Sequence, residues 1–248
     1  MRTIGIIGGS GLDDPDILEN AQDMVVQTPF GPPASPLKTG TIAGRKVALV
    51  ARHGRQHTDS PTKVNNRANL WALRDFGCDA ILATTAVGSL REDIERGDLV
   101  VLDQFIDFTR LRALTFFEEF EPHAPSHTPM AEPFDAALRE TLCFACSAAN
   151  IQHHTTGTVV TIEGPRFSTR AESNMFRAWG ADVINMSTAP ECILANELGI
   201  PYAAVAMSTD YDCWKTDEAA VTWEEVLRTF QENVTKVTKV LLESVRAL

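Results

Sequence analysis

The sequence predicts an α/β fold: a single domain over residues 1–248 with a mixed, mostly parallel central β-sheet flanked by helices. Short, nearly continuous apolar runs alternate along the chain with helical patterns, as expected for strands that are buried on both faces of a parallel sheet. No repeat, low-complexity stretch or linker divides the chain, and 248 residues are within the range of one large α/β domain. We therefore expect one domain.

The individual elements follow from the spacing of apolar residues. The predicted strands are 3–8, 46–52, 80–86, 98–107, 158–162, 182–186 and 202–207. Helical patterns at 67–76, 170–179 and 191–198 each end before a glycine, a common C-terminal stop. A fourth pattern covers 134–150, and the chain ends in a long amphipathic helix that starts near Thr222. Thr188 and Glu191 have the spacing of a capping box at the start of the 191–198 pattern.

The composition is that of a globular protein with an acidic surface. Hydrophobic residues make up 44% of the chain and charged residues 22%, which excludes an intrinsically disordered protein. The formal net charge of −11 argues against a nucleic-acid partner or an anionic membrane, and no apolar run is long enough to span a bilayer.

The cysteines and the first residues of the chain indicate in which cellular compartment the protein is expected. Five cysteines are scattered along the chain, which fits a reducing compartment better than a disulfide framework. Cys143 and Cys146 have CxxC spacing but lie late in a helical pattern, so we expect thiols that face the core rather than a redox or metal site. The first residues already have a strand pattern, so we expect no signal peptide and a cytoplasmic protein.

Polar segments follow four of the predicted strands. Segment 8–11 (GGSG) offers backbone amides and a hydroxyl, 52–57 (RHGRQH) a guanidinium and imidazoles, and 84–89 (TTAVGS) and 185–188 (NMST) offer hydroxyls. Glycines let the backbone approach a ligand closely, and an arginine is a strong bidentate partner for phosphate. Each segment alone is unspecific. Together they predict an oxyanion site, most simply for inorganic phosphate.

Two carboxylates and one aromatic ring complete the predicted site. Asp210 and Asp212 follow the last predicted strand, where positions i and i+2 face the same way. Such a pair can donate a proton to one ligand atom and accept one from another, although a solvated turn is the alternative. Phe167 follows a Gly-Pro pair and is expected to stack on a base, although a core position is the alternative.

Several longer segments resemble one family. They are GGSGL (8–12), RHG (52–54), NLWAL (69–73) with TTA (84–86), VTIEGPRF (160–167), RAES (170–173), WGADVINM (179–186) and TDYDCW (209–214). These segments are similar to those of methylthioadenosine phosphorylases, in the trimeric branch of the purine nucleoside phosphorylases, essentially from end to end. The resemblance implies cleavage of 5′-methylthioadenosine by phosphate to adenine and 5-methylthioribose 1-phosphate, in methionine and purine salvage. It also implies a homotrimer with sites at subunit contacts, and no metal or organic cofactor.

The resemblance implies roles for individual residues. Phosphate would be held by Ser10, Arg52, His53, Thr85, the Ala86 amide and Ser187. The nucleoside would be contacted by Phe167, Met186, His127, His57, Trp223, Val226 and Leu227. His127 would reach the methylthio end of the ligand of a neighbouring subunit, with His57 near the same region. Asp210 and Asp212 would be the catalytic pair, facing the N7 and N6 edge of adenine.

The expected mechanism places Asp210, in its protonated form, as the donor to N7 of the departing purine. Carboxylates at 210 and 212 can accept the exocyclic amine of adenine, so we expect adenine rather than a 6-oxopurine. Trp223 departs from the family, which often has a smaller aliphatic residue there. We expect a sulfur–ring contact with the methylthio group; a narrower pocket or plain helix packing are the alternatives.

Three rival interpretations stay open at this level. The enzyme could use adenosine or methylthioinosine as its main substrate, which the region of Trp223 and His127 would decide. A nucleoside-binding or regulatory protein without chemistry is disfavoured, because Arg52, Asp210 and Asp212 are all present. A dehydrogenase is disfavoured further, since the glycine fingerprint and a following ribose-binding acid are missing. Segment 111–130 could be a lid, a subunit contact or both; its prolines at 122, 125 and 129 indicate only a loop.

Overall fold

The computed structural model describes residues 2–9, 11–13, 16–216 and 223–248, with the side chains of 223–232 left out. Its strands are β1 (Ile4–Gly8), β2 (Glu19–Met24), β3 (Leu37–Ile42), β4 (Arg45–Ala51), β5 (Ala80–Ser89), β6 (Leu99–Val101), β7 (Gln104–Phe108), β8 (His153–His154), β9 (Thr158–Ile162), β10 (Val183–Asn185) and β11 (Tyr202–Tyr211). Its helices are α1 (Asn66–Phe76), α2 (Ala136–Ala148), α3 (Arg170–Ala178), α4 (Thr188–Glu197) and α5 (Trp223–Ala247).

The described strands form one mixed sheet. Its main order is β2-β3-β4-β1-β5-β10-β9-β7, with β11 beside β5, β6 beside β11 and β8 beside β6. The pairs β1–β4, β1–β5, β11–β5, β10–β9, β7–β9 and β6–β8 are parallel, whereas β2–β3, β3–β4, β10–β5 and β11–β6 are antiparallel. The predicted fold class is therefore confirmed, and one sheet drawn from Ile4 to Tyr211 favours a single domain.

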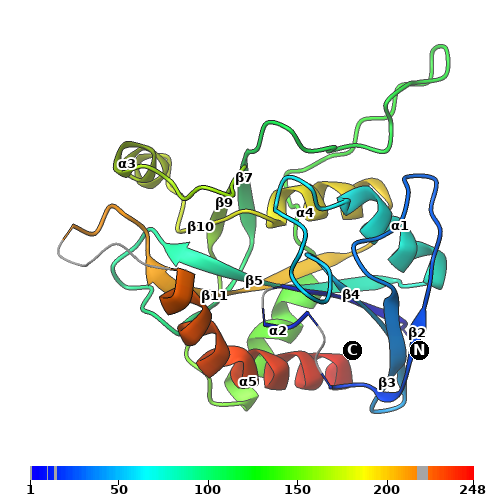
Figure 1. Ribbon diagram of the computed structural model, residues 1–248, viewed down its shortest axis with the longest axis horizontal. Helices are drawn as coiled ribbons and strands as arrows, with labels where there is room; N and C mark the ends of the chain where they lie inside the picture. Colours follow the sequence, from blue (N-terminus) through cyan, green and yellow to red (C-terminus); the bar gives the residue numbers. More distant parts are fainter. Residues whose placement is uncertain (1, 10, 14–15, 217–222) are drawn as a thin grey trace.

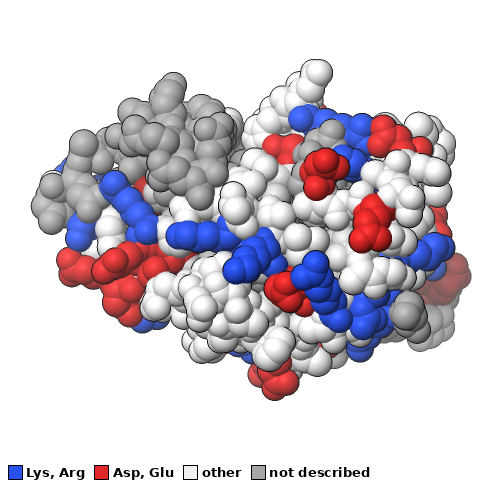
Figure 2. Space-filling model, turned by 90° about the horizontal axis from the view of Figure 1, so that it is seen from below, with Lys and Arg blue, Asp and Glu red and all other residues white. Residues whose placement is uncertain are grey.

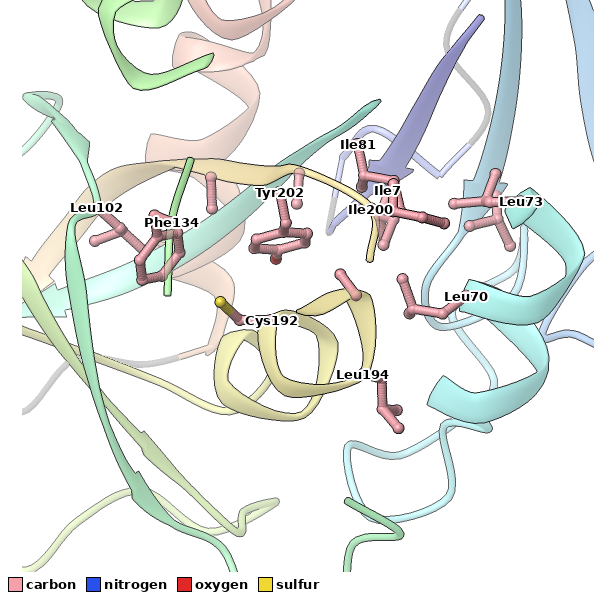
Figure 3. Close-up of a cluster of buried hydrophobic side chains, with 14 of the residues drawn as sticks. Ile7, Leu70, Leu73, Ile81, Leu102, Phe134, Cys192, Leu194, Ile200 and Tyr202 are labelled. Carbon is pink, nitrogen blue, oxygen red and sulfur yellow. The ribbon is translucent and has the colours of Figure 1, made fainter. Parts of the chain in front are cut away.

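Helices cover both faces of the sheet, which explains the apolar strands. Figure 1 shows α1 and α4 on one side of the sheet, and α2 and α5 on the other. On the first side, Leu70 and Leu73 of α1 and Cys192 and Leu194 of α4 belong to one buried cluster with Ile7, Ile200 and Tyr202 (Figure 3). On the second side, α2 and α5 share a cluster with the opposite faces of β1, β4, β5 and β11. Strands buried in this way must be apolar at consecutive positions.

The structure differs from the sequence-based prediction in three strands. The β2–β3 pair was not predicted, because all six residues of β2 are exposed and its sequence ENAQDM has no apolar pattern. The predicted strand 98–107 is two strands, β6 and β7, which pair with different neighbours. Strands β5 and β11 continue to Ser89 and Tyr211, so segment 84–89 and Asp210 lie inside strands, and Asp212 directly follows β11.

Helix ends show one confirmed and one wrong prediction. Gly77, Gly180 and Gly199 have φ angles of 92°, 85° and 67°, the left-handed conformation that glycine adopts without strain. The capping box predicted at Thr188 and Glu191 is wrong, since α4 begins after Ser187 and Glu191 pairs elsewhere. The capping box is instead at Thr169 and Glu172 of α3. The one predicted at Thr222 lies outside the described residues.

Charge and cysteines fit the composition. Figure 2 shows Lys and Arg side chains in a row across one face, flanked by Asp and Glu side chains, so both signs occur side by side there. All five cysteines are free thiols, and burial raises the pKa of Cys146 to about 12. In the described part of the chain, no helix is long and apolar enough to cross a bilayer.

Candidate active site

The cavity opens where strand β5 changes its neighbour. Strand β1 pairs with β5 up to Ala83, and the antiparallel β10 pairs with β5 from Gly88 onward. Strand β11 continues along the other edge of β5 through this stretch. Residues 84–87 therefore face the gap between two neighbours, which is the kind of topological switch point where open α/β sheets bind ligands. Because β1, β4 and β5 run parallel, the segments after Gly8 and Ala51 reach the same place.

The gap contains a cavity that is open to solvent and that residues from several strands and loops line. Its wall includes ten residues that the sequence predicted for the site: Arg52, His53, His57, Thr85, Ala86, Phe167, Met186, Ser187, Asp210 and Asp212. The remaining lining residues are Pro61, Val87, Gly88, Ile162, Ser168, Ile184, Asn185 and Thr209. Residues up to 160 positions apart thus meet around one space.

Arg52 lies at one end of the cavity with its guanidinium fixed. Glu191 of α4 forms a bidentate pair with it through Nε and Nη2, and Nη1 donates to the carbonyl of Thr84 at 2.9 Å. Both charged side chains are buried, at 2% and 1% exposure, and the Tyr202 hydroxyl donates to the same carboxylate at 2.9 Å. Burial alone would lower the pKa of Arg52, but Glu191 raises it, so the guanidinium stays charged.

Gly9 is needed for this placement of Arg52. A Cβ at Gly9 would lie 2.6 Å from Nη1 of Arg52 and 2.8 Å from the carbonyl oxygen of Thr84, closer than atoms of this kind approach. The Gly9 amide donates to the hydroxyl of Thr84 at 3.2 Å. The glycine-rich segment therefore serves first to let the guanidinium pack against the backbone.

Hydroxyl groups and a helix N-terminus lie beside Arg52. The hydroxyls of Thr85 and Ser187 are 3.2 Å apart, and the Asn185 amide donates to Thr85 Oγ1 at 3.1 Å. Ser187 is the N-cap residue of α4, but its side chain makes no capping hydrogen bond. Its hydroxyl is thereby turned toward Thr85 and the cavity, where the positive end of the helix dipole favours an anion.

His53 is a buried neutral imidazole. Its Nδ1 is 2.8 Å from the carbonyl oxygen of Asp59, and because a carbonyl only accepts, Nδ1 carries the proton. Burial and the charge of Arg52 lower the pKa of His53 to about 4. The ring of His57 packs against it with centroids 4.5 Å apart.

The two predicted carboxylates lie at the other end of the cavity. Thr209 Oγ1 donates to Asp210 Oδ1 at 2.6 Å, and Ser168 Oγ donates to Asp212 Oδ2 at 2.6 Å. The register of β11 shifts between Ser208 and Asp210, so the placement rests on an irregularity rather than on simple alternation. Gly88 of β5 lies beside both carboxylates, since a Cβ there would be in ordinary contact with them, at 3.4 Å from Asp210 Oδ2 and 3.5 Å from Asp212 Cβ.

An exposed ring and a thioether form the remaining wall. The side chain of Phe167 is 54% exposed, which favours the stacking interpretation over a core position. Met186 packs on the loop that precedes Phe167, since a Cβ at Gly164 would lie 2.4 Å from its Sδ. The cavity thus combines anion donors at one end, carboxylates at the other and a flat apolar wall between them.

Five predicted residues are not among the described residues that line the cavity. His127 is exposed and contacts the ring of Phe120, within segment 111–130, which projects from the body of the molecule (Figure 1). Its expected contact with a neighbouring subunit stays a prediction. Ser10 and the side chains of Trp223, Val226 and Leu227 lie outside the described residues.

Several site residues had no visible signal in the sequence. Glu191 was assigned to a cap, because its partner Arg52 is 139 residues away. Tyr202 was assigned to a strand and Ser168 to a loop. Gly88 and Thr209 lie within segments that had been singled out, but their roles depend on how the strands pair.

Comparison with known proteins agrees with this geometry. The family described as Phosphorylase superfamily matches residues 3–246. S-methyl-5′-thioadenosine phosphorylases are 56% identical over 245 residues in Danio rerio (98% of this chain, 87% of the relative) and 52% identical over 244 residues in Drosophila melanogaster (98% and 84%).

Solved structures are similar over the whole chain. Methylthioadenosine phosphorylase from Schistosoma mansoni in complex with adenine is 42% identical with a TM-score of 0.94, covering 100% of this chain and 92% of that one. A mutant adenosine/methylthioadenosine phosphorylase from the same organism, in complex with methylthioadenosine, is 41% identical with a TM-score of 0.93, covering 100% and 91%. The chain therefore belongs to the phosphorylase superfamily, and within it to the methylthioadenosine phosphorylases.

Proposed function

We propose that this protein cleaves 5′-methylthioadenosine with inorganic phosphate, giving adenine and 5-methylthioribose 1-phosphate. The observation that carries the proposal is one cavity with a fixed guanidinium and hydroxyls at one end and Asp210 and Asp212 at the other. Relatives at 50–56% identity over nearly the whole chain have this activity in their names, which supports the same assignment.

Phosphate occupies the end formed by Arg52, Thr85 and Ser187, with the Ala86 amide and His53 beside it and Ser10 as a further donor. Three N–H groups of Arg52 already bind Glu191 and Thr84, which leaves two of its five for the anion. Because the carboxylate of Glu191 already balances the positive charge of Arg52, the hydroxyls and the N-terminus of α4 must supply the remaining stabilisation of the bound phosphate.

The nucleoside lies between Phe167 and Met186, with its base at the carboxylates. A phosphate oxygen forms a bond to the anomeric carbon as the bond from that carbon to N9 breaks, and the electron pair of the broken bond passes to the purine. Protonated Asp210 donates to N7 and so neutralises the leaving group. A positioned donor of this kind is worth about 3 kcal/mol, or a factor of ~10²–10³ in rate.

The choice of base depends on Asp212 and Asp210. The hydroxyl of Ser168 binds Oδ2 of Asp212, which orients this carboxylate as an acceptor for the exocyclic amine of adenine. A 6-oxopurine presents a carbonyl at that place, and two acceptors repel each other. We therefore assign adenine nucleosides as substrates.

The assembly, location and chemistry of the protein follow the same proposal. Segment 111–130 carries His127 to the ligand of a neighbouring subunit in a homotrimer, and Trp223, Val226 and Leu227 line the 5′ pocket. The reaction as proposed needs no metal or organic cofactor. Five free thiols favour a reducing compartment, so we place the protein in the cytoplasm.

The test is purine release from methylthioadenosine, adenosine and methylthioinosine in parallel, each with and without phosphate. Phosphate-dependent release that is fastest from methylthioadenosine is expected. Release from adenosine alone would mean that the 5′ pocket is closed to a methylthio group. If none of the three gives phosphate-dependent release, the protein is not a phosphorylase of these nucleosides.

A further inference from the structure

An ion pair outside the cavity, between buried Arg112 and partly exposed Glu163, joins the segments that form the nucleoside wall of the cavity. Arg112 lies at the base of the projecting segment 111–130, and its side chain is 2% exposed. Its Nε donates to Glu163 Oε1 at 3.0 Å, and its Nη2 donates to the carbonyl oxygens of Glu163 at 2.7 Å and Met186 at 3.1 Å. One guanidinium thus fixes the backbone at Glu163 and at Met186.

The carboxylate of Glu163 collects donors from two further segments. Its Oε2 accepts the backbone amides of Arg110 at 2.7 Å and Leu111 at 3.1 Å, and its Oε1 accepts the hydroxyl of Thr62 at 2.8 Å. Burial alone would raise the pKa of Glu163, but these hydrogen bonds and that from Arg112 together lower it to about 2. The carboxylate of Glu163 is therefore ionised, and it is held by the Thr62 hydroxyl, by two backbone amides and by the Arg112 guanidinium.

The segments of Thr62 and Glu163 continue directly into the cavity wall. Thr62 follows Pro61, and Glu163 precedes the loop that carries Phe167. Between them, a Cβ at Gly164 would lie 2.4 Å from Met186 Sδ and 3.4 Å from Pro61 Cγ. Neither Arg112 nor Glu163 is among the residues that line the cavity, so the pair acts on a ligand only through the residues that it holds.

We propose that Arg112 and Glu163 are positioning residues for the nucleoside, because they set the distance between Phe167 and Met186. This rests on the proposed function for the identity of the ligand. The anion end has separate supports: Arg52 is held by Glu191 and Thr84, and Ser187 lies against Thr85. Loss of the Arg112–Glu163 pair therefore weakens nucleoside and adenine binding and leaves phosphate binding nearly unchanged.

The first test is Arg112→Met, which keeps an unbranched apolar stem and removes the whole guanidinium with all its donors. We expect at least about a ten-fold rise in KM for methylthioadenosine and in the calorimetric Kd for adenine, because hydrogen bonds to a charged group are lost from two backbone supports. KM for phosphate is expected to change less than about two-fold. Arg110→Met is the matched control, since it removes a charge two residues away and keeps the amide that Glu163 accepts.

A double-mutant cycle separates positioning from general damage. Glu163→Gln alone is expected to raise the Kd for adenine. In the double variant, the fold-increase in this Kd is expected to be well below the product of the two single fold-increases, because both substitutions disrupt the same ion pair. If Arg112→Met does not fold, Arg112→Lys takes its place, since one ammonium cannot bridge Glu163 and Met186.

The proposal is overturned if adenine Kd stays within about two-fold of wild type, or if KM for phosphate rises in step with KM for the nucleoside. These outcomes differ from failure of the proposed function. A wild-type protein that binds adenine without releasing it from any nucleoside would overturn the reaction, and the Arg112 and Glu163 variants would still test the binding claim.

Discussion

The Arg52–Glu191 pair allows a prediction with a calculable size. Glu191→Gln keeps the shape of the side chain but removes its charge, and the amide group can accept from only part of the guanidinium. Removing one partner of a buried ion pair costs about 3–5 kcal/mol, because the other charge is left uncompensated. Both side chains are almost fully buried and no salt can screen them, so the full range applies.

For a chain of 248 residues, each kcal/mol lowers Tm by about 2–4 °C. The variant should therefore unfold roughly 6–20 °C below wild type in buffer without phosphate. Saturating phosphate should then raise Tm by more in the variant than in wild type, because the anion supplies the counter-charge that Glu191 no longer provides. Turnover should fall, since the guanidinium loses its fixed orientation.

The assay is thermal and urea unfolding of wild type and variant, each without phosphate and with a saturating concentration. Glu243→Gln is the matched control, because Glu243 pairs with Arg246 on the exposed surface of α5, where such a pair is worth under about 1 kcal/mol. If Glu191→Gln lowers the free energy of unfolding by less than about 1 kcal/mol, Arg52 does not depend on this carboxylate. If saturating phosphate raises Tm equally in wild type and variant, phosphate does not contact Arg52.

Three further predictions concern the cavity. Asp210→Asn should lower kcat by about 10²-fold or more with little change in phosphate binding; unchanged turnover in steady-state assays would remove Asp210 as proton donor. Phe167→Ala should weaken adenine binding by about 1–3 kcal/mol in calorimetry, whereas Phe144→Ala, at an equally exposed ring on α2, should not; equal effects would count against stacking. Burial holds the pKa of His53 at about 4, below the ordinary 6.5, so the unfolded chain takes up a proton first as the pH falls. Stability present above pH 6.5 should be lost toward pH 4, by at most about 3 kcal/mol. Urea unfolding across this range should show a smaller loss in His53→Asn than in wild type, with exposed His123→Asn as control; identical profiles for His53→Asn and wild type would contradict the buried neutral imidazole.

Much of the fold can be predicted from local patterns, because a buried strand or a helix end is recognisable from a few consecutive residues. The apolar runs at β1, β4, β5, β9 and β11 and the glycines that end α1, α3 and α4 were predictable for this reason. Strand β2 was not, since a fully exposed edge strand has no apolar alternation. The ends of β5 and β11 were also not predictable, because the polar residues near these ends line the cavity and have the composition of a loop.

The sequence by itself determined which chemical groups are present: a guanidinium, hydroxyls, two carboxylates and a ring, each next to a strand. Tertiary structure decided which of them are fixed. The sequence predicts a capping role for Glu191, whereas the fold places it on Arg52. Arg112 carries no signal in the sequence, and Glu163 lies in a family-like segment that gives no hint of its partner. The physical reason is that a buried charge depends on its partner, and these partners lie 51 and 139 residues apart in the chain. Only the change of neighbour along β5, from β1 to β10, brings the two ends of the cavity together.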